Sequence, residues 1–299
     1  MLRSLRDLAF YTVSATDGDV GSVVDFLLDD ERWTIRYLVV ETSDFRDKRQ
    51  VLISPISFRR AEWSIERFHL ALTMKKVKNS PRVNVGEPVS RQRERDYDHY
   101  YGYSCYWGHP GLWGMGARPG LLAAGRGTEA PVERSNNSND VHLRSAAKIR
   151  GYHIQGSEEA IGHVEDFIVD DETWEVRYLV IDTSSGWLGK KVLVAPHWAN
   201  RISWENRKVY VNMSRQAIES SPKWDGTAAV SREYEARLYD YHARPAYWAS
   251  GVRRVAAAPP HSEIHRMAET RSKHGVTPAA LHSVSPRTNE PERRQVAPR

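Results

Sequence analysis

Two segments of the chain carry almost the same fifteen residues. Residues 29–43 read DDERWTIRYLVVETS, and residues 170–184 read DDETWEVRYLVIDTS. With an offset of 141 positions, residues 2–107 (the first repeat) align with residues 143–248 (the second repeat) without a gap, and 32 of the 106 aligned pairs are identical. A unit of this length is a whole domain, because solenoid repeats are much shorter. The chain is therefore predicted to contain the same fold twice.

Each repeat contains short apolar runs that alternate with polar residues and are rich in Val, Ile, Tyr and Trp, which favours strands over helices. The pattern predicts a mainly all-β protein of two tandem small antiparallel β-barrels, since closing a sheet removes its exposed edges. A short helical aromatic arm is predicted after each barrel. The predicted strands lie at residues 20–28, 33–42, 50–54, 58–65, 68–73, 191–195, 200–205 and 208–214, and the arms at 89–101 and 230–242.

The fifteen shared residues are interpreted as a β-hairpin with DDER at its turn. A tight turn at these residues pairs the strands so that Asp25 faces Arg36, and Asp166 faces Arg177 in the second repeat. Such cross-strand charge pairs contribute roughly 0.2–1 kcal/mol each and help to fix the register.

The predicted organisation has four parts. Residues 1–107 form the first barrel with its arm, 108–140 a Gly-, Pro- and polar-rich linker, 141–250 the second barrel with its arm, and 251–299 a disordered basic tail. The tail holds nine Lys/Arg and four Asp/Glu, whereas the other residues hold 34 of each sign. Nucleic acid is therefore not an expected partner of the barrels, although it is a candidate partner of the tail.

Composition also bears on compartment and chemistry. The chain has no run of about eighteen apolar residues and no secretory signal at its start, so we expect a cytoplasmic protein, with peripheral attachment to the inner face of the membrane as an alternative. The single cysteine, Cys105, is interpreted as a packed thiol. None of the nucleotide-binding, P-loop, zinc-protease or serine-hydrolase motifs occurs. We predict no catalytic residue and no cofactor.

The acidic turns are weak candidates for a metal site, because hard cations prefer several carboxylate oxygens. The candidates are Asp29, Asp30, Asp170 and Asp171. Their spacing differs from that of an EF-hand loop, so a solvated turn without metal is the preferred interpretation.

The aromatic arms allow two interpretations. Tyrosine and tryptophan are favoured at interfaces and membrane surfaces, but they also pack against their own domain. Residues 93–114 hold five tyrosines and two tryptophans. The candidate partner-contacting residues are Tyr100, Tyr101, Tyr103, Tyr106, Trp107, Trp113, Tyr241, Tyr247 and Trp248.

The segment DGDVGSVVDFLLDDERWTIRYLVVETS with VLISP resembles the PRC-barrel family, as does GHVEDFIVDDETWEVRYLVIDTS with VLVAP in the second repeat. Members include the cytoplasmic domain of the photosynthetic reaction-centre H subunit and the C-terminal half of a ribosome maturation factor. The resemblance implies a barrel that binds other proteins. It covers both repeats, but the chain lacks the H subunit's membrane helix and the maturation factor's different first domain.

These observations predict a non-catalytic adaptor that binds a protein partner, with self-association as a further expectation. One alternative is an H-subunit-like peripheral component of a photosynthetic or electron-transfer membrane complex. Another is a ribosome- or RNA-associated factor that uses its basic tail. Duplicated domains often keep the interface of an ancestral homodimer, so the two barrels are candidates for packing together as a pseudo-dimer.

Overall fold

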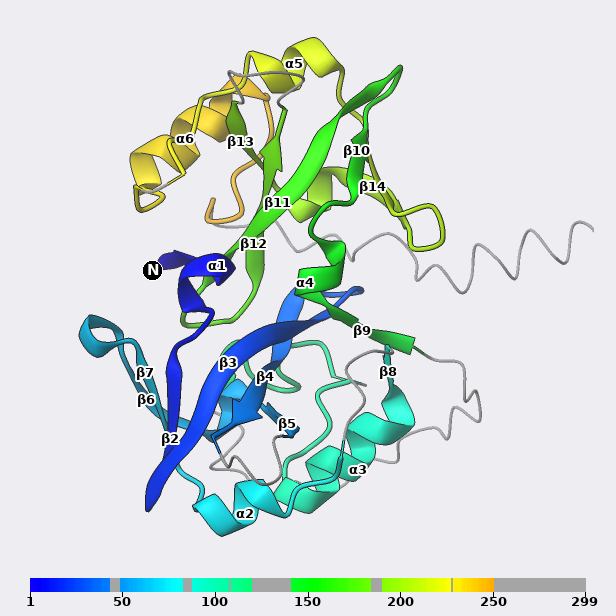
Figure 1. Ribbon diagram of the computed structural model, residues 1–299. Coiled ribbons are helices and arrows are strands. Elements are labelled where there is room, and N and C mark those ends of the chain that lie inside the picture. The colour runs from blue at the N-terminus through cyan, green and yellow to red at the C-terminus, as the bar shows by residue number, and fades with distance from the viewer. Residues whose placement is uncertain are drawn as a thin grey trace, which may run out of the picture. The chain divides into compact units, whose positions relative to one another are not determined.

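The duplicated sequence forms two copies of the same series of strands and short helices (Figure 1). The computed structural model describes residues 1–43, 49–82, 88–107, 109–119, 141–183, 190–226 and 228–249. All of them belong to one compact unit, Met1–Ala258. The predicted tail, residues 251–299, and most of the predicted linker lie outside the described residues.

In the first repeat a short strand and helix precede a long hairpin, and a second hairpin and a final helix follow it. The elements are β1 (Leu2–Ser4), α1 (Leu5–Leu8), β2 (Thr12–Ala15), β3 (Gly18–Asp29), β4 (Thr34–Thr42), β5 (Gln50–Ile53), β6 (Phe58–Glu62), β7 (Arg67–Leu70), α2 (Met74–Lys78), β8 (Val89–Ser90) and α3 (Arg91–Tyr101).

The second repeat has the same order, apart from a counterpart of β8. Its elements are β9 (Val141–Ser145), α4 (Ala146–Ile149), β10 (His153–Gln155), β11 (Ala160–Asp170), β12 (Val176–Asp182), β13 (Lys191–Val194), β14 (Ala199–Ser203), β15 (Lys208–Val211), α5 (Arg215–Glu219) and α6 (Arg232–Tyr241).

Each repeat is built on one mixed sheet. The first sheet runs β5-β4-β3-β2-β7-β6 and the second β13-β12-β11-β10-β15-β14. The prediction of a purely antiparallel sheet is wrong, because β2 pairs with β7, and β10 with β15, in parallel. A two-residue alternation identifies a strand but carries no information on the direction of its neighbour. Neither sheet closes into a ring within the described part of the chain.

The predicted hairpin exists, but its register differs from the prediction. Asp25 lies opposite Val39, and Phe26 lies opposite Leu38. The strands carry irregularities between Val23 and Asp25 and between Leu27 and Leu28, and each bulge adds a residue to one strand. Asp25 therefore does not face Arg36, and in the second repeat Asp166 likewise faces Val180.

The shared glycine near the start of each long strand is explained by a close approach of the chain. A Cβ added to Gly21 would lie 1.9 Å from the carbonyl oxygen of Glu41, and one added to Gly162 would lie 2.0 Å from that of Asp182. Since no other residue fits at these distances, the hairpin of each repeat depends on this glycine.

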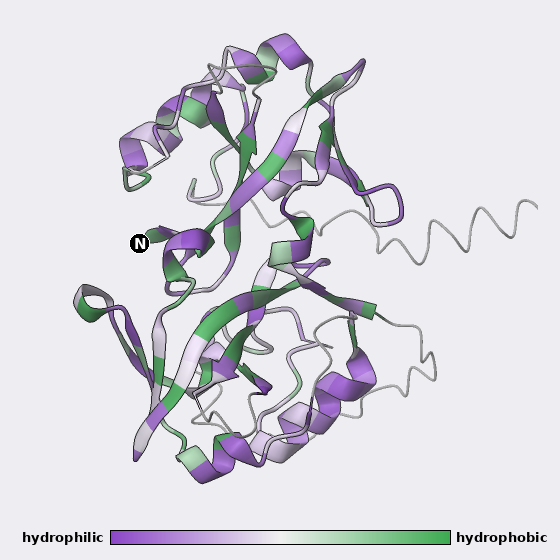
Figure 2. Cartoon of the chain, in the orientation of Figure 1, coloured by the Kyte–Doolittle hydropathy of each residue, from purple (hydrophilic) through white to green (hydrophobic). Residues whose placement is uncertain are grey.

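The core covers both faces of the first sheet, because β4 is buried along almost its whole length and a second hydrophobic cluster packs between this sheet and α3. Figure 2 shows hydrophobic and hydrophilic residues interleaved along the strands, whereas α3 is largely hydrophilic. Phe26 and Leu38 in the first repeat, and Phe167 and Leu179 at the same positions in the second, are at most 1% exposed and belong to a single hydrophobic cluster. The two repeats therefore share a continuous core.

The repeats also exchange their first strands. The strand β1 of the first repeat pairs antiparallel with β11 of the second, and β9 of the second pairs antiparallel with β3 of the first. We call these two reciprocal pairings, with the side chains around them, the repeat interface. No helix among the described residues is both long and apolar enough to cross a membrane.

Candidate functional site

The polar residues that both repeats share gather at the repeat interface. The hydroxyl of Ser145 donates to the carboxylate of Asp25 at 2.5 Å, and the backbone N–H of Ala147 donates to the same carboxylate at 2.9 Å. The hydroxyl of Ser4 donates in the same way to Asp166. Because Ser4 corresponds to Ser145 and Asp25 to Asp166, each repeat binds the first strand of the other through the same pair of residues.

Two ion pairs connect the repeats in the same reciprocal way. Arg144 bonds to Asp30 at 3.0 Å, and Arg3 bonds to Asp171 at 2.8 Å. Burial raises the pKa of Asp30 to about 6, although the charge of Arg144 opposes this shift. Both carboxylates thus hold the partner repeat's strand instead of lying in a solvated turn.

The tips of the two long hairpins pair with each other as well. The N–H of Ile35 donates to the carbonyl of Trp174 at 2.8 Å, and the N–H of Val176 donates to the carbonyl of Trp33 at 2.7 Å. The Trp174 ring lies in the first repeat's aromatic core, with its centroid 5.5 Å from that of Phe58. The hairpin turns therefore contribute both backbone bonds and core packing to the interface.

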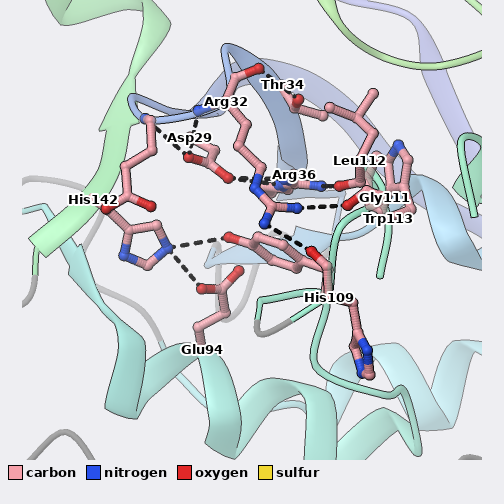
Figure 3. Close-up of polar contacts among 12 residues, drawn as sticks. Asp29, Arg32, Thr34, Arg36, Glu94, His109, Gly111, Leu112, Trp113 and His142 are labelled. Atoms are coloured by element: carbon pink, nitrogen blue, oxygen red, sulfur yellow. Dashed lines mark hydrogen bonds and ion pairs between the residues drawn. The ribbon is translucent and has the colours of Figure 1, made fainter. Parts of the chain in front are cut away.

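A buried ion pair lies beneath the first hairpin (Figure 3). Arg36 is 1% exposed and bonds to Asp29, which is fully buried, at 2.8 Å. Burial alone would raise the pKa of Asp29, but the charges of Arg36 and His142 lower it below its ordinary value. The carboxylate therefore remains ionised inside the protein, as a buried pair requires.

The segment after the first arm closes over this pair. Arg36 donates to the carbonyl of Leu112 at 2.7 Å, and its guanidinium lies 3.5 Å from the centre of the Tyr106 ring. Arg32 donates to the carbonyls of Gly111 and His109 at 2.5 and 3.0 Å. This part of the predicted linker is thus held against the first repeat by two arginines.

A histidine on β9, one position before the second repeat, also belongs to the cluster. His142, on β9, lies 2.9 Å from the carboxylate of Glu94 on α3 and 3.1 Å from the hydroxyl of Tyr106 (Figure 3). His142 is 2% exposed and Glu94 is fully buried. Burial would lower the pKa of His142, but the bond to Glu94 and its charge raise it overall. The pair therefore favours a protonated histidine at the repeat interface.

The same positions in the second repeat are more open. Arg177 bonds to Asp170 at 3.4 Å and to Glu175 at 2.9 Å, its side chain is 11% exposed, and its guanidinium lies 4.1 Å from the centre of the Tyr247 ring. The counterpart of His142 is Met1, whose terminal ammonium bonds to Asp171. The ionic cluster is thus sealed in one repeat only.

The predicted metal candidates are all engaged by cations of the protein. Asp29, Asp30, Asp170 and Asp171 bond to Arg36, Arg144, Arg177 and Arg3 respectively. In the described ranges no group of three His, Cys, Asp or Glu side chains is arranged to hold a metal ion. The preferred interpretation of a solvated turn is wrong for Asp29, which is fully buried.

The aromatic residues of the first arm and of the segment after it are buried or partly buried, and one of them bonds to the second repeat. Tyr106 and Trp113 are 3% and 1% exposed, so neither presents a surface to a partner. The indole N–H of Trp113 donates to the carbonyl of Thr173 at 2.7 Å. Among the predicted contact residues, Tyr241 is the most open at 46%, while the others are partly buried: Tyr100, Tyr101, Tyr103, Trp107, Tyr247 and Trp248.

Sequence reasoning missed Glu94, Asp98 and His142. Asp98 accepts a bond from the hydroxyl of Tyr37 at 3.1 Å, and burial followed by the charge of Glu94 raises its pKa well above the ordinary value. The exchanged contacts between the repeats had a signal in the sequence. The residues LRS occur at the start of both repeats, and their serines and arginines make these contacts. His142 has no such signal, since its counterpart in the other repeat is Met1.

The comparisons agree with this architecture at the level of one domain. No curated protein matches the sequence. Residues 142–217, which run from the exchanged strand β9 into α5, match the family model of the PRC-barrel domain. PRC-barrel domains are generally non-catalytic, so this match suggests that the second repeat is a module for protein interaction.

Proposed function

We propose that this chain is a non-catalytic adaptor that holds protein partners on a single body made from its two repeats. The observation that carries the proposal is the reciprocal exchange of β1 and β9, with its serine–aspartate and arginine–aspartate contacts. A binding protein that must hold partners in a fixed relation benefits from such a connection, because it leaves less conformational entropy to lose on binding.

The buried cluster supports a structural role for the ionisable residues. Strongly perturbed carboxylates and histidines mark active sites, but ion-pair networks that hold a fold together perturb the pKa in the same way. Asp29, Arg36, Glu94 and His142 are at most 2% exposed. Their bonds join elements of the two repeats to each other, so the cluster stabilises the body whose outer faces are left for partners.

The proposal is tested by capturing the tagged, natively expressed protein from soluble and membrane fractions after nuclease treatment. The expected result is a stoichiometric protein partner that survives nuclease and is retained by a chain that ends at residue 249. Recovery in the membrane fraction alone would favour the H-subunit-like alternative.

A second result would overturn the adaptor role. If the captured material is ribosomal or RNA-bound, disappears with nuclease and is lost when residues 250–299 are removed, the function lies in the basic tail. Such binding would also weaken steeply as the salt concentration rises, because it would depend on contacts to phosphate.

A further inference from the structure

An exposed phenylalanine of the first repeat sits in a backbone conformation that suits glycine. Phe10 has φ 71° and is 77% exposed. Its counterpart, Gly151, has φ 82°, and a Cβ placed there would meet no atom within 4 Å. A bulky side chain at positive φ is strained, and this one gains no compensating burial within the chain. The strain therefore points to a role for the ring outside its own fold.

A second exposed apolar residue lies at the same end of the sheet. Thr12 pairs with Arg67 in the parallel ladder, so Phe10 and Ile65 both stand two residues before that pair. Ile65 is 57% exposed, and its counterpart in the second repeat is the polar Asn206. The first repeat thus presents two apolar side chains where the second repeat presents none.

The charges beside these residues have opposite sign in the two repeats. Exposed Asp7 and Glu66 flank Phe10 and Ile65, and their counterparts are the exposed bases Lys148 and Arg207. Burial raises the pKa of the Tyr11 hydroxyl, the charge of Glu66 adds to the shift, that of Arg3 opposes it and that of Asp7 adds to it. We call Asp7, Phe10, Ile65 and Glu66 the first tip, and Lys148, Gly151, Asn206 and Arg207 the second tip.

Two arginines border each tip, and all four already bond to carboxylates. Beside the first tip Arg3 and Arg6 bond to Asp171 and Glu165, and beside the second tip Arg144 and Arg150 bond to Asp30 and Asp166. The acidic Glu205 also precedes the second tip. The charges that differ in sign between the tips are therefore those of Asp7 and Glu66 on the first and Lys148 and Arg207 on the second.

A hollow beside the second tip offers a place for an apolar side chain. Its volume is about 70 Å³, and Lys148, Ile149, Tyr152 and Trp204 are among its lining residues. The guanidinium of Arg207 lies 5.6 Å from the centre of the Tyr152 ring. Small-molecule sites enclose roughly 300–1,000 Å³, so this hollow suits part of one side chain instead of a free ligand.

We propose that the first tip of one molecule docks on the second tip of another copy of this chain. Phe10 then packs against the hollow at Ile149, Tyr152 and Trp204, while Asp7 and Glu66 face Lys148 and Arg207. In Figure 1 the hairpins β6–β7 and β14–β15 project on opposite sides of the compact unit, so one molecule offers both tips at once.

This contact is heterologous, because the two surfaces that meet are different. Each added molecule leaves a free tip at either end, so the assembly grows into an open chain unless the rotation between neighbours closes a ring. Few residues take part, which places the contact among weak interfaces and calls for measurement at high protein concentration.

The first experiment is sedimentation velocity of the full chain from about 1 μM to about 500 μM, a range that spans weak self-association. Wild-type protein is expected to form species that grow with concentration beyond a dimer. Phe10→Gly should abolish this growth and raise the midpoint of thermal unfolding by roughly 2–4 °C, because glycine relieves the positive-φ strain. A variant that is more stable yet no longer associates cannot be explained by misfolding.

The second experiment tests the charges by reversal. Glu66→Arg and Arg207→Glu should each abolish association alone, since like charges then meet across the contact. An equimolar mixture of the two variants should restore it, because every contact then joins opposite charges again. The double variant E66R/R207E should associate without a second protein, because its own two tips again carry opposite charges.

Three results would overturn the proposal. These are a monomer at every concentration, a closed dimer that Phe10→Gly does not affect, and a mixture of charge variants that stays monomeric while the wild type associates. None of these depends on whether the adaptor captures a different protein, so the outcome is independent of the proposed function.

Discussion

Arg36 and Arg177 occupy the same position in the two repeats, yet their surroundings differ. Arg36 is almost fully buried against Asp29, Tyr106 and the Leu112 carbonyl, whereas Arg177 keeps 11% of its side chain exposed. The two arginines are therefore expected to contribute differently to the free energy of unfolding, although the sequence is the same at both positions. The difference arises from residues 109–113, which cover the first site.

We expect Arg36→Met to destabilise the protein by about 3–5 kcal/mol, because it leaves the carboxylate of Asp29 buried without its partner. The matched control is Arg177→Met, for which a loss of about 1 kcal/mol is expected, since Asp170 is closer to solvent. Urea unfolding of both variants measures the difference. Equal losses would contradict the assigned burial of the first site.

His142 predicts a decrease in stability at alkaline pH. Its folded-state pKa is raised above the ordinary 6.5, so its contribution is complete below pH 6.5 and is lost as the pH rises through the folded-state pKa. His142→Gln should remove that decrease while keeping a hydrogen-bond donor near Glu94. The free energy of unfolding measured from pH 6 to 9 in wild type and variant tests this, and parallel curves would refute it.

The carboxyl of Asp30 acts in a lower and separate range. Its pKa is raised from 3.8 to about 6, so protonation favours folding, and the associated stability is lost as the pH rises between these values. Asp30→Asn should reduce this slope between pH 4 and 6 and leave the slope above pH 7 unchanged. Unfolding by urea across both ranges separates the two groups.

At the scale of elements, the strands and the arm helices were largely predictable, but the register and the exchange were not. Short runs rich in Val, Ile, Leu and Tyr place β3, β4, β11 and β12 correctly, because these residues favour buried strands whichever face they cover. The register failed at the bulges near Asp25, which no local pattern announces. The exchange of β1 and β9 depends on packing between segments more than 100 residues apart, so no local propensity encodes it.

Asp25 should contribute more to the free energy of unfolding than an ordinary surface carboxylate does, because it bonds to β9 and α4 of the other repeat. We expect Asp25→Ala to cost about 1–3 kcal/mol, since the buried Ser145 hydroxyl loses its acceptor and the exposed N–H of Ala147 loses one as well. Asp19→Ala is the control: that side chain is 54% exposed and bonds within its own repeat to Arg67. Urea midpoints that shift equally in both variants would argue against the exchanged contact.

At the scale of the whole molecule, the shared core and the exchanged strands predict one cooperative unit. Calorimetry of the full chain should show a single transition with equal calorimetric and van't Hoff enthalpies, instead of one transition for each repeat. Arg36→Met should shift this transition as a whole. A first-repeat transition that moves while a second stays in place would show that the repeats unfold separately.

The exchange of strands also couples sequence changes in one repeat to the structure of the other. Each repeat completes its sheet with a strand from the other, so a change at Asp25 acts on the fit of Ser145, and a change at Asp166 acts on Ser4. Neither copy can be deleted without leaving the end of β3 or β11 in its twin unpaired along one edge. Loss of one copy would therefore damage the other. The two copies differ instead at positions that take no part in the exchanged contacts, such as Glu66 and its counterpart Arg207, which carry opposite charges.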